Sequence, residues 1–369
     1  MATPSPFDDV TFPSFSELPF RKGDPPGAIW GFYEHVSKSE AKDELGALNL
    51  LTPSRILRAS QNEIKMGKVC SLNWELHKPF PAAFGRKGLE HKVFWMKAVK
   101  STFVVDDEVS MNTQCGSQWD GFKHFSYYAT RSSLFYFQVR FAGRRSDFFV
   151  CFWTVDQFYN GLDVKDVLDE SQGYVGKYNA LDKHMRNGIH KFQGKIVGRG
   201  VLLDYYSYAQ TQGKPYAPSE SVAITAQDLE DCAKAQGLQF EQGDILFVRT
   251  GYIHWFESAT EEERENGLQL AKGYVGVRPT MEEVEWLWNH HFAAVASDCP
   301  SFEALPTTEK WSLHDYLLPL WGTPIGEFFD LEKLSETCKE LGRYSFFLTS
   351  SPLNVVNGIA SPPNAMAIF

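Results

Sequence analysis

Basic clusters and long apolar runs are both missing from this sequence. The chain has 369 residues and a formal net charge of −10, and it contains no run of five or more lysines or arginines. Because nucleic-acid binding depends on concentrated positive charge, we expect no nucleic-acid partner. No stretch approaches the roughly 18 apolar residues of a membrane span, and the N-terminus has no basic start followed by an apolar run. We therefore expect no membrane partner and a cytoplasmic location.

Paired cysteines and the common nucleotide and esterase motifs are missing as well. The six cysteines are widely spaced and form no CxxC pair, which predicts reduced, mostly buried thiols. The sequence has no GxxxxGK[ST] phosphate loop, no GxSxG elbow and no internal repeat. Nucleotide hydrolysis and serine esterase chemistry therefore lack their usual sequence support.

Alternating helix and strand signals indicate an α/β protein. Thr52-Pro53, Thr225 with Asp228, and Thr280 with Glu283 are each typical of a helix start, and Asp330 is expected to cap a fourth helix. Runs rich in Val, Ile, Leu and Phe predict strands in 92–150, 196–204, 244–251, 292–296 and 344–348.

The chain is expected to form one domain with additions. Prolines and polar residues dominate the start, so residues 1–42 are predicted to be an N-terminal arm and residues 43–369 the catalytic domain. Residues 155–195 are polar and rich in turn-forming residues, which predicts an insertion at the surface, outside the main sheet.

The densest group of potential ligands lies in residues 114–124. In an extended segment alternate side chains point the same way, so Gln114, Gln118, Asp120 and His124 are expected to converge on one side. Carboxylate and imidazole are ordinary ligands of Zn²⁺ and Mn²⁺. Spacing alone still favours a hydrogen-bonded Asp–His pair over a metal site.

The same segment resembles the signature of a known enzyme family. It reads QxGSQxDxFxH, which is similar to the HxGTHxDxPxH motif of the cyclase family that includes bacterial kynurenine formamidases and isatin hydrolases. Gly116, Asp120 and His124 match, Ser117 replaces a threonine, and Gln114 and Gln118 stand in place of histidines. Further matching blocks, among them GRGVLLD, GDILFVRTGY and HDYLLPLWGTPIGE, extend the resemblance over residues 43–369. The resemblance implies a single-domain α/β protein with the swivelling β/β/α cyclase-like fold.

The resemblance also implies a metal site. Family members with two cations hold one through the two early histidines and the shared aspartate, a set that the glutamines damage because an amide oxygen is a weaker ligand than imidazole. The second set is complete here, so one divalent ion, Zn²⁺ or Mn²⁺, is expected on Asp120, His124, His314 and Glu327. The residues expected to contribute to catalysis are His124, Gln118, Ser117 and Gln114. Whether His124 acts as a ligand or as a base is open.

Three functions are compatible with these residues. The first is a metal-dependent hydrolase of an amide, lactone or formamide bond in a small metabolite, aromatic or otherwise. The second is a non-hydrolytic cyclase, dehydratase or isomerase of specialised metabolism that uses the same metal site. The third is a metal-free binding protein, which the two glutamines motivate. The partners expected are a small-molecule substrate and, from the resemblance, further copies of the chain in a homo-oligomer.

Other residues that invite a functional reading are assigned structural roles. His290 and His291 end a predicted helix, Cys299 has no adjacent base, and Cys115 faces away from the ligand row. Arg249 and Asp204 end predicted strands and are expected to form a buried ion pair. Tyr252 and Trp255 are weak candidates for a substrate pocket.

Overall fold

The architecture is taken from a computed structural model of the chain. The structure describes residues 4–99, 102–128, 134–141, 144–151, 156–167, 186–268, 273–307 and 309–369. Side chains are described for most of these residues, but not for 96–99, 102–103, 128, 134–141 and 144–151.

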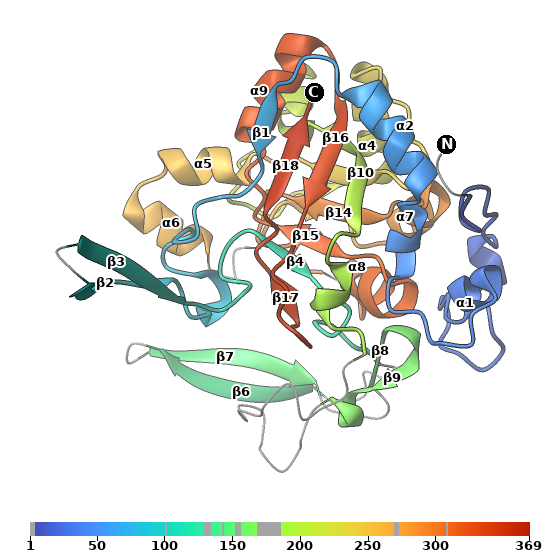
Figure 1. Cartoon of the computed structure of the whole chain (residues 1–369), viewed down its shortest axis with the longest axis horizontal. Coiled ribbons are helices and arrows are strands. Elements are labelled where there is room, and N and C mark those ends of the chain that lie inside the picture. The colour runs from blue at the N-terminus through green and yellow to red at the C-terminus, as the bar shows by residue number, and fades with distance from the viewer. Residues whose placement is uncertain are drawn as a thin grey trace.

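A nine-stranded mixed sheet forms the centre of the described chain, in the order β1-β18-β16-β10-β12-β14-β15-β4-β17 (Figure 1). Its strands are β1 (Val69–Ser71), β4 (Gln118–Asp120), β10 (Ile196–Leu203), β12 (Ile245–Val248), β14 (Ala294–Ser297), β15 (Ile325–Glu327), β16 (Ser345–Ser350), β17 (Ala360–Ser361) and β18 (Ala365–Ile368). Strands β10, β12, β14 and β15 are parallel to one another. All residues of β12 and β14 are buried, as expected for parallel strands covered on both faces.

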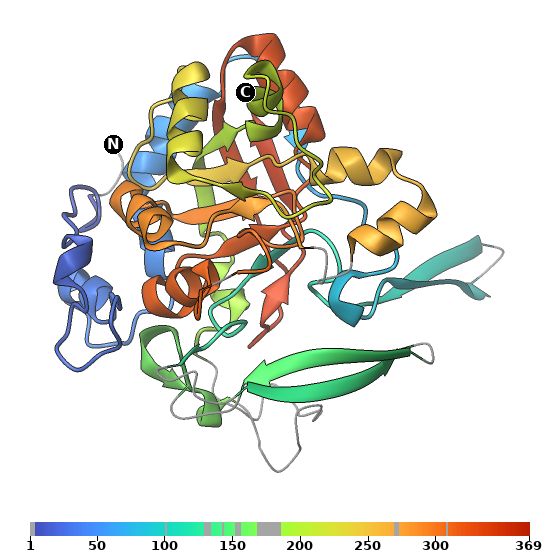
Figure 2. The same cartoon turned by 180° about the vertical axis from the view of Figure 1, so that it is seen from behind.

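Helices cover both faces of this sheet. Helix α2 (Pro53–Glu63) packs on β10 and β16, while α4 (Ala226–Ala235) and α7 (Met281–His290) lie across the other face (Figures 1 and 2). The remaining helices are α1 (Phe32–Ser37), α3 (Tyr205–Thr211), α5 (Tyr252–Ser258), α6 (Glu261–Gly267), α8 (Leu313–Asp315) and α9 (Glu332–Leu341). Short turns of 3-10 helix are η1 (Phe15–Glu17), η2 (Gly46–Leu50), η3 (Ala83–Gly85), η4 (Tyr159–Gly161), η5 (Val164–Asp166) and η8 (Ile189–Phe192), and η10 (Tyr316–Trp321) is π-helical.

The other strands form four small sheets. They are the pair β11 (Ala223–Ile224) and β13 (Gly276–Val277), the hairpin β2 (Glu90–Val99) and β3 (Thr102–Ser110), the hairpin β6 (Leu134–Phe141) and β7 (Arg144–Cys151), and the set β5 (Tyr127–Tyr128), β8 (Asp156–Phe158) and β9 (Leu162–Asp163). Both hairpins project from the body (Figures 1 and 2).

Two of the predicted helix caps are confirmed and a third is wrong. Thr52 caps α2 by accepting a hydrogen bond from the backbone of Arg55, and Thr225 forms a capping box with Asp228, which confirms both predictions. The capping box predicted at Thr280 is wrong, because no side-chain cap bond forms there and the Thr280 hydroxyl instead bonds the Glu283 carboxylate.

The last helix also starts differently from the prediction. Its N-cap is Leu331, one residue after Asp330, although the Asp330 carboxylate still accepts a bond from the backbone N–H of Glu332 at 3.1 Å. The cap position is therefore shifted while its electrostatic role is kept.

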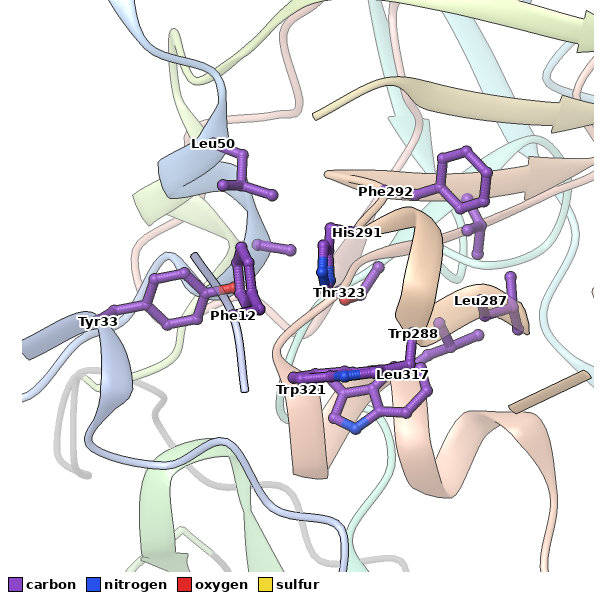
Figure 3. A pocket seen from close by; sticks show the side chains of 12 residues that line it. Phe12, Tyr33, Leu50, Leu287, Trp288, His291, Phe292, Leu317, Trp321 and Thr323 are labelled. Carbon is purple, nitrogen blue, oxygen red and sulfur yellow. The ribbon is translucent and has the colours of Figure 1, made fainter. Parts of the chain in front are cut away.

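The described part of the N-terminal arm packs against the body. Trp30 is buried and its indole N–H donates to the carbonyl of Pro319 at 2.6 Å. Phe12 stacks on His291 with ring centroids 4.1 Å apart, at the edge of an apolar pocket that Tyr33 and Trp321 also line (Figure 3). The boundary between arm and domain at residue 42 stays a prediction.

The predicted insertion is only partly described. Within 156–167 and 186–195, strands β8 and β9 belong to a small sheet apart from the nine-stranded one, yet Tyr159 and Phe192 are fully buried. Residues 152–155 and 168–185 lie outside the described residues, so a surface insertion over 155–195 stays a prediction.

The described residues contain free cysteines and no helix suited to cross a membrane. Five of the six cysteines have described side chains, and all five are buried and free, as predicted: Cys70, Cys115, Cys232, Cys299 and Cys338. None of the helices in the described ranges is both long and apolar enough to span a bilayer.

Candidate metal centre

Strand pairing brings the two halves of the candidate centre together. β4 runs antiparallel to β15, and the register places Gln118 opposite Glu327 and Asp120 opposite Ile325. Side chains of directly opposed residues lie on the same face of a sheet. Trp119 points to the other face, where it is buried and its indole N–H donates to Ser350. Gly326 opposes Trp119, and a Cβ there would lie 2.5 Å from the ring of Phe329.

The convergence predicted for residues 114–124 occurs, but the segment is not extended throughout. Only Gln118–Asp120 is strand. A turn before it carries Gln114, whose backbone N–H donates to the Asn112 side chain, and a turn after it carries His124, whose N–H donates to the carbonyl of Gly121 at 2.9 Å. The turns therefore fold Gln114 and His124 back toward Asp120.

Three of the four predicted ligands share one location. His314 lies in the short helix α8, where its Nε2 is 3.4 Å from the Glu327 carboxylate. One ligand atom each of Asp120, His314 and Glu327 lies within 4.8 Å of the others, and all three residues are buried. His124 is peripheral to this group: its Nε2 is 3.8 Å from Asp120, and its ring centre is 6.4 Å from that of His314.

The two glutamines that replace the motif histidines donate hydrogen bonds to the carboxylates. The Gln114 amide donates to Asp120 at 2.6 Å and to Nδ1 of His124 at 3.1 Å. The Gln118 amide donates to Asp120 at 3.2 Å and to Glu327 at 2.8 Å. Both amides therefore supply hydrogen-bond donors to carboxylates, which when ionised can only accept.

Burial and charge shift the ionisation of the centre. Burial raises the pKa of Glu327 above its ordinary value, and the Asp120 carboxylate raises it further against the opposing effect of His314. Burial alone would lower the pKa of His314, but the carboxylates of Glu303 and Glu327 raise it well above its ordinary value. For His124, burial lowers the pKa and the Asp120 carboxylate only partly offsets it.

These features fit a divalent cation. Asp120 Oδ2 is fully buried and has no hydrogen-bond partner in the structure. A buried carboxylate oxygen without a partner is costly, and a cation held by Asp120, Glu327 and His314 would satisfy it. Two carboxylates and an imidazole form a donor set suited to Zn²⁺ or Mn²⁺.

Ser117, also predicted to act in catalysis, is engaged elsewhere. Its hydroxyl donates to the carbonyl of Phe328 at 2.6 Å and accepts from the backbone N–H of Trp74 at 2.8 Å. It therefore ties the motif segment to the chain around Trp74 and Phe328, and its hydroxyl proton is already used.

Two residues that the sequence analysis did not select lie beside the centre. The Arg86 guanidinium donates to the backbone carbonyl of Gln114 at 2.8 Å and lies 3.5 Å from the Gln118 side-chain oxygen. Both carboxylate oxygens of Glu303 lie 2.8 Å from Nδ1 of His314. No local pattern marks Arg86, whereas Glu303 stands among apolar residues shortly after a predicted strand, where sites of α/β proteins often lie.

The residues assigned structural roles behave accordingly. Arg249 forms a buried ion pair with Asp204 at 2.8 Å, as predicted. His290 Nδ1 bonds the carbonyl of Trp286 in the preceding turn. Cys299 is fully buried, and burial raises the pKa of its thiol. Tyr252, in contrast, is a sequence-based candidate for the substrate pocket; it is fully buried, and its hydroxyl donates to the carbonyl of Gly267 at 3.3 Å.

Comparison with known proteins places the chain in a family. The family model described as "Putative cyclase" matches residues 71–304. No curated protein matches the chain. A crystal structure described as that of a novel cyclase is 25% identical, covers 93% of this chain and 99% of its own, and has a TM-score of 0.73.

More distant solved structures were also found. Isatin hydrolase A from Labrenzia aggregata is 14% identical, with 81% of this chain and 93% of that chain covered and a TM-score of 0.48. A predicted metal-dependent hydrolase from Bacillus stearothermophilus is 14% identical, with 82% and 98% covered and a TM-score of 0.44.

The fold and the ligand cluster thus define an α/β protein with the architecture of the cyclases. The chain belongs to the cyclase family, because the family model matches more than half of its length. The family resemblance and the fold expected from it are confirmed.

Proposed function

We propose that this cyclase-family chain is a metal-dependent hydrolase that cleaves an amide, lactone or formamide bond of a small metabolite. The observation that carries the proposal is the meeting of Asp120, His314 and Glu327 within 4.8 Å, together with the unpartnered oxygen of Asp120. Both favour a bound divalent cation over a purely hydrogen-bonded cluster.

Each residue has a distinct role in this proposal. Asp120, His314 and Glu327 hold the cation, which when bound polarises a carbonyl and lowers the pKa of water. His124 lies at the more exposed side of the cluster, within reach of Asp120, and accepts the proton of the attacking water before returning it to the leaving nitrogen or oxygen. Arg86 stabilises the negative charge that develops on the acyl oxygen. The Gln118 amide, whose N–H groups donate to Asp120 and Glu327, holds these two carboxylates in place.

Asp120→Asn tests the centre. It keeps the size of the side chain but removes an anionic ligand, so we expect the bound metal to fall at least about tenfold from roughly one Zn²⁺ or Mn²⁺ per wild-type chain. Inductively coupled plasma mass spectrometry measures the metal. Mass spectrometry of aryl formamides, amides and lactones incubated with each protein detects the addition of water.

A matched control separates loss of the metal from loss of the fold. Asp244 is equally buried but is paired with Arg199 away from the centre, so Asp244→Asn should keep its metal. Full metal occupancy in Asp120→Asn, or a wild type that hydrolyses substrate without metal, would overturn the proposal.

The glutamine contacts favour one alternative, a metal-free binding protein. Their amides already donate to Asp120 and Glu327, which partly replaces the compensation that a cation would give. A wild type that binds ligands but retains no metal after incubation with Zn²⁺ or Mn²⁺ would support that alternative. The same mass measurement identifies a cyclase, dehydratase or isomerase by a product that has lost water or kept its mass.

The remaining expectations about partners stay predictions. A small molecule is the proposed substrate, and a homo-oligomer is proposed from the family. Sedimentation of the purified chain measures its state of association.

A further inference from the structure

Glu303 is held next to the candidate centre by a close approach of two backbone segments. Val277 and Glu303 form an isolated parallel bridge, and the backbone N–H of Ala304 donates to the carbonyl of Val277 at 2.9 Å. Gly276 allows this approach, because a Cβ there would lie 2.5 Å from the carbonyl carbon of Glu303. The backbone that carries the Glu303 side chain is therefore held on both sides, since the N–H of Val277 also donates to the carbonyl of Phe302 at 3.0 Å.

The Glu303 carboxylate is committed to one partner in the described part of the chain. It is 3% exposed, and both of its oxygens lie 2.8 Å from Nδ1 of His314. The only cationic side chain within ion-pair distance among the described residues is that of His314. Burying a carboxylate that has no arginine or lysine partner costs folding free energy. The burial of Glu303 therefore points to a role other than packing.

The contact between Glu303 and His314 sets the orientation of the His314 ring. Nδ1 faces Glu303, while Nε2 faces Glu327 at 3.4 Å and lies in the group with Asp120. A hydrogen bond from Nδ1–H to a carboxylate fixes the ring orientation and leaves the Nε2 lone pair for a ligand. The two nitrogens of the ring therefore have separate roles.

We propose that Glu303 is a positioning residue that keeps the proton on Nδ1 of His314 and so presents Nε2 to a cation shared with Asp120 and Glu327. The inference rests on the proposed metal centre and adds a residue to it. Carboxylates behind ligating histidines raise the basicity of the imidazole, and their loss typically weakens metal binding by about 10- to 100-fold.

Glu303→Gln tests this role by direct metal binding. The amide keeps the shape and can still accept from Nδ1–H, but it removes the charge, so the dissociation constant for Zn²⁺, measured by competition with a chromophoric chelator, should rise by about 10- to 100-fold. Substituting Co²⁺ gives a second readout, because its visible absorption reports the ligand geometry. Glu303→Asp, which keeps the charge but withdraws it by one methylene, should bind Zn²⁺ with intermediate affinity.

Glu283→Gln is the matched control. Glu283 is fully buried, pairs with Arg278 and accepts from the backbone N–H of Ala226, away from the centre. This variant should keep the Zn²⁺ affinity of the wild type even if its stability falls. Equal weakening in Glu283→Gln would show a general effect of losing a buried charge and would overturn the inference.

The outcomes separate this inference from the proposed function. A wild type that binds neither Zn²⁺ nor Co²⁺ rejects the metal centre and the positioning role together. A wild type that binds Zn²⁺, with unchanged affinity and Co²⁺ spectrum in Glu303→Gln, rejects only the role of Glu303. If circular dichroism shows that Glu303→Gln does not fold, Glu303→Asp decides: weakened binding supports the role and wild-type binding rejects it.

Discussion

Gln118 connects the two carboxylates of the candidate centre. Its amide nitrogen donates to Asp120 and to Glu327, while its oxygen faces Arg86. In the metal-free chain this one side chain supplies donors to two buried acceptors. With a cation in place, the carboxylates have a stronger partner and depend less on the amide.

The carboxylates depend on the Gln118 amide more in the metal-free chain than in the metal-bound chain, so Gln118→Ala should destabilise the two forms by different amounts. Without metal, the variant should lose about 1–3 kcal/mol of unfolding free energy, because the Glu327 oxygen loses its donor while Asp120 keeps only that of Gln114. With Zn²⁺ or Mn²⁺ the loss should be smaller, because the cation compensates Asp120 and Glu327. Urea unfolding with added metal and with a chelator measures both values. An equal loss in both states would show that Gln118 does not act through the carboxylates, and the exposed Gln227→Ala serves as the control.

The sequence indicated the residues of the candidate centre but not the residues that support them. Asp120, His314 and Glu327 could be selected because the family motif and the late HDYLLPLWGTPIGE block carry them. Their convergence depends on the pairing of β4 with β15, which no local pattern reveals. Arg86 was not predicted because no pattern links it to Gln118, 32 residues later. Glu303 was not predicted because nothing in the stretch to His314, 11 residues later, shows that the chain brings its carboxylate to the ring. Whether His124 is a ligand or a base stays open in the sequence, and the structure places it at the edge of the cluster.

At the scale of elements, two glycines join the start of η2 to the end of η10. The backbone N–H of Ala47 donates to the carbonyl of Gly322, and a Cβ on Gly46 would lie 2.0 Å from that same oxygen. Gly46 also has a positive φ of 53°. Because η10 directly follows the helix that carries His314, this contact helps to set the position of His314.

Gly46→Ala should therefore be more damaging than an ordinary glycine substitution. A left-handed backbone costs an alanine about 1–2 kcal/mol, and the overlap with Gly322 adds at least about 1–3 kcal/mol as in an overpacked core. Gly67 is the matched control, since it has a positive φ of 69° but a Cβ added there would have no atom within 4 Å. Chemical denaturation of both variants measures the difference. Equal losses in Gly46→Ala and Gly67→Ala would exclude the backbone contact as the cause.

Elements with strong local signals were predictable, and their exact ends were less so. The buried strands β10, β12 and β14 follow from their apolar runs, and α2 and α4 follow from their caps. The box expected at Thr280 does not form, because one Glu283 oxygen accepts from Arg278 and from the backbone N–H of Ala226, while the other accepts from the Thr280 hydroxyl. The backbone N–H of Ala226, distant in the chain, thus takes the place of the local N–H that a capping box would use.

At the scale of the whole molecule, the arm closes one side of the body. Figure 3 shows Phe12 of the arm facing His291 at the end of α7, and Tyr33 and Trp288 line the same pocket. Trp30 and Trp321 reinforce the contact through hydrogen bonds to the carbonyls of Pro319 and Gly27. The arm therefore contributes to one continuous core.

The packing of the arm on His291 predicts a dependence of stability on pH. Burial, together with a smaller effect of the neighbouring His290, lowers the pKa of His291 to about 4. The unfolded chain has an ordinary histidine pKa of about 6.5, so between these values the unfolded state binds a proton that the folded state does not. The contribution of His291 is thus complete above about pH 6.5 and is lost as the pH falls to about 4, at up to about 1.4 kcal/mol per pH unit.

His291→Asn should reduce this slope. Asparagine tolerates the left-handed backbone of this position, where φ is 49°, but it does not titrate. We expect the variant to be less stable at neutral pH, because the stacking with Phe12 is lost, and to lose less stability than the wild type between about pH 6.5 and 4. Urea unfolding across this range measures the slope, with the exposed His77→Asn as the control. Parallel curves for His291→Asn and the wild type would show that protonation of His291 does not oppose the docking of the arm.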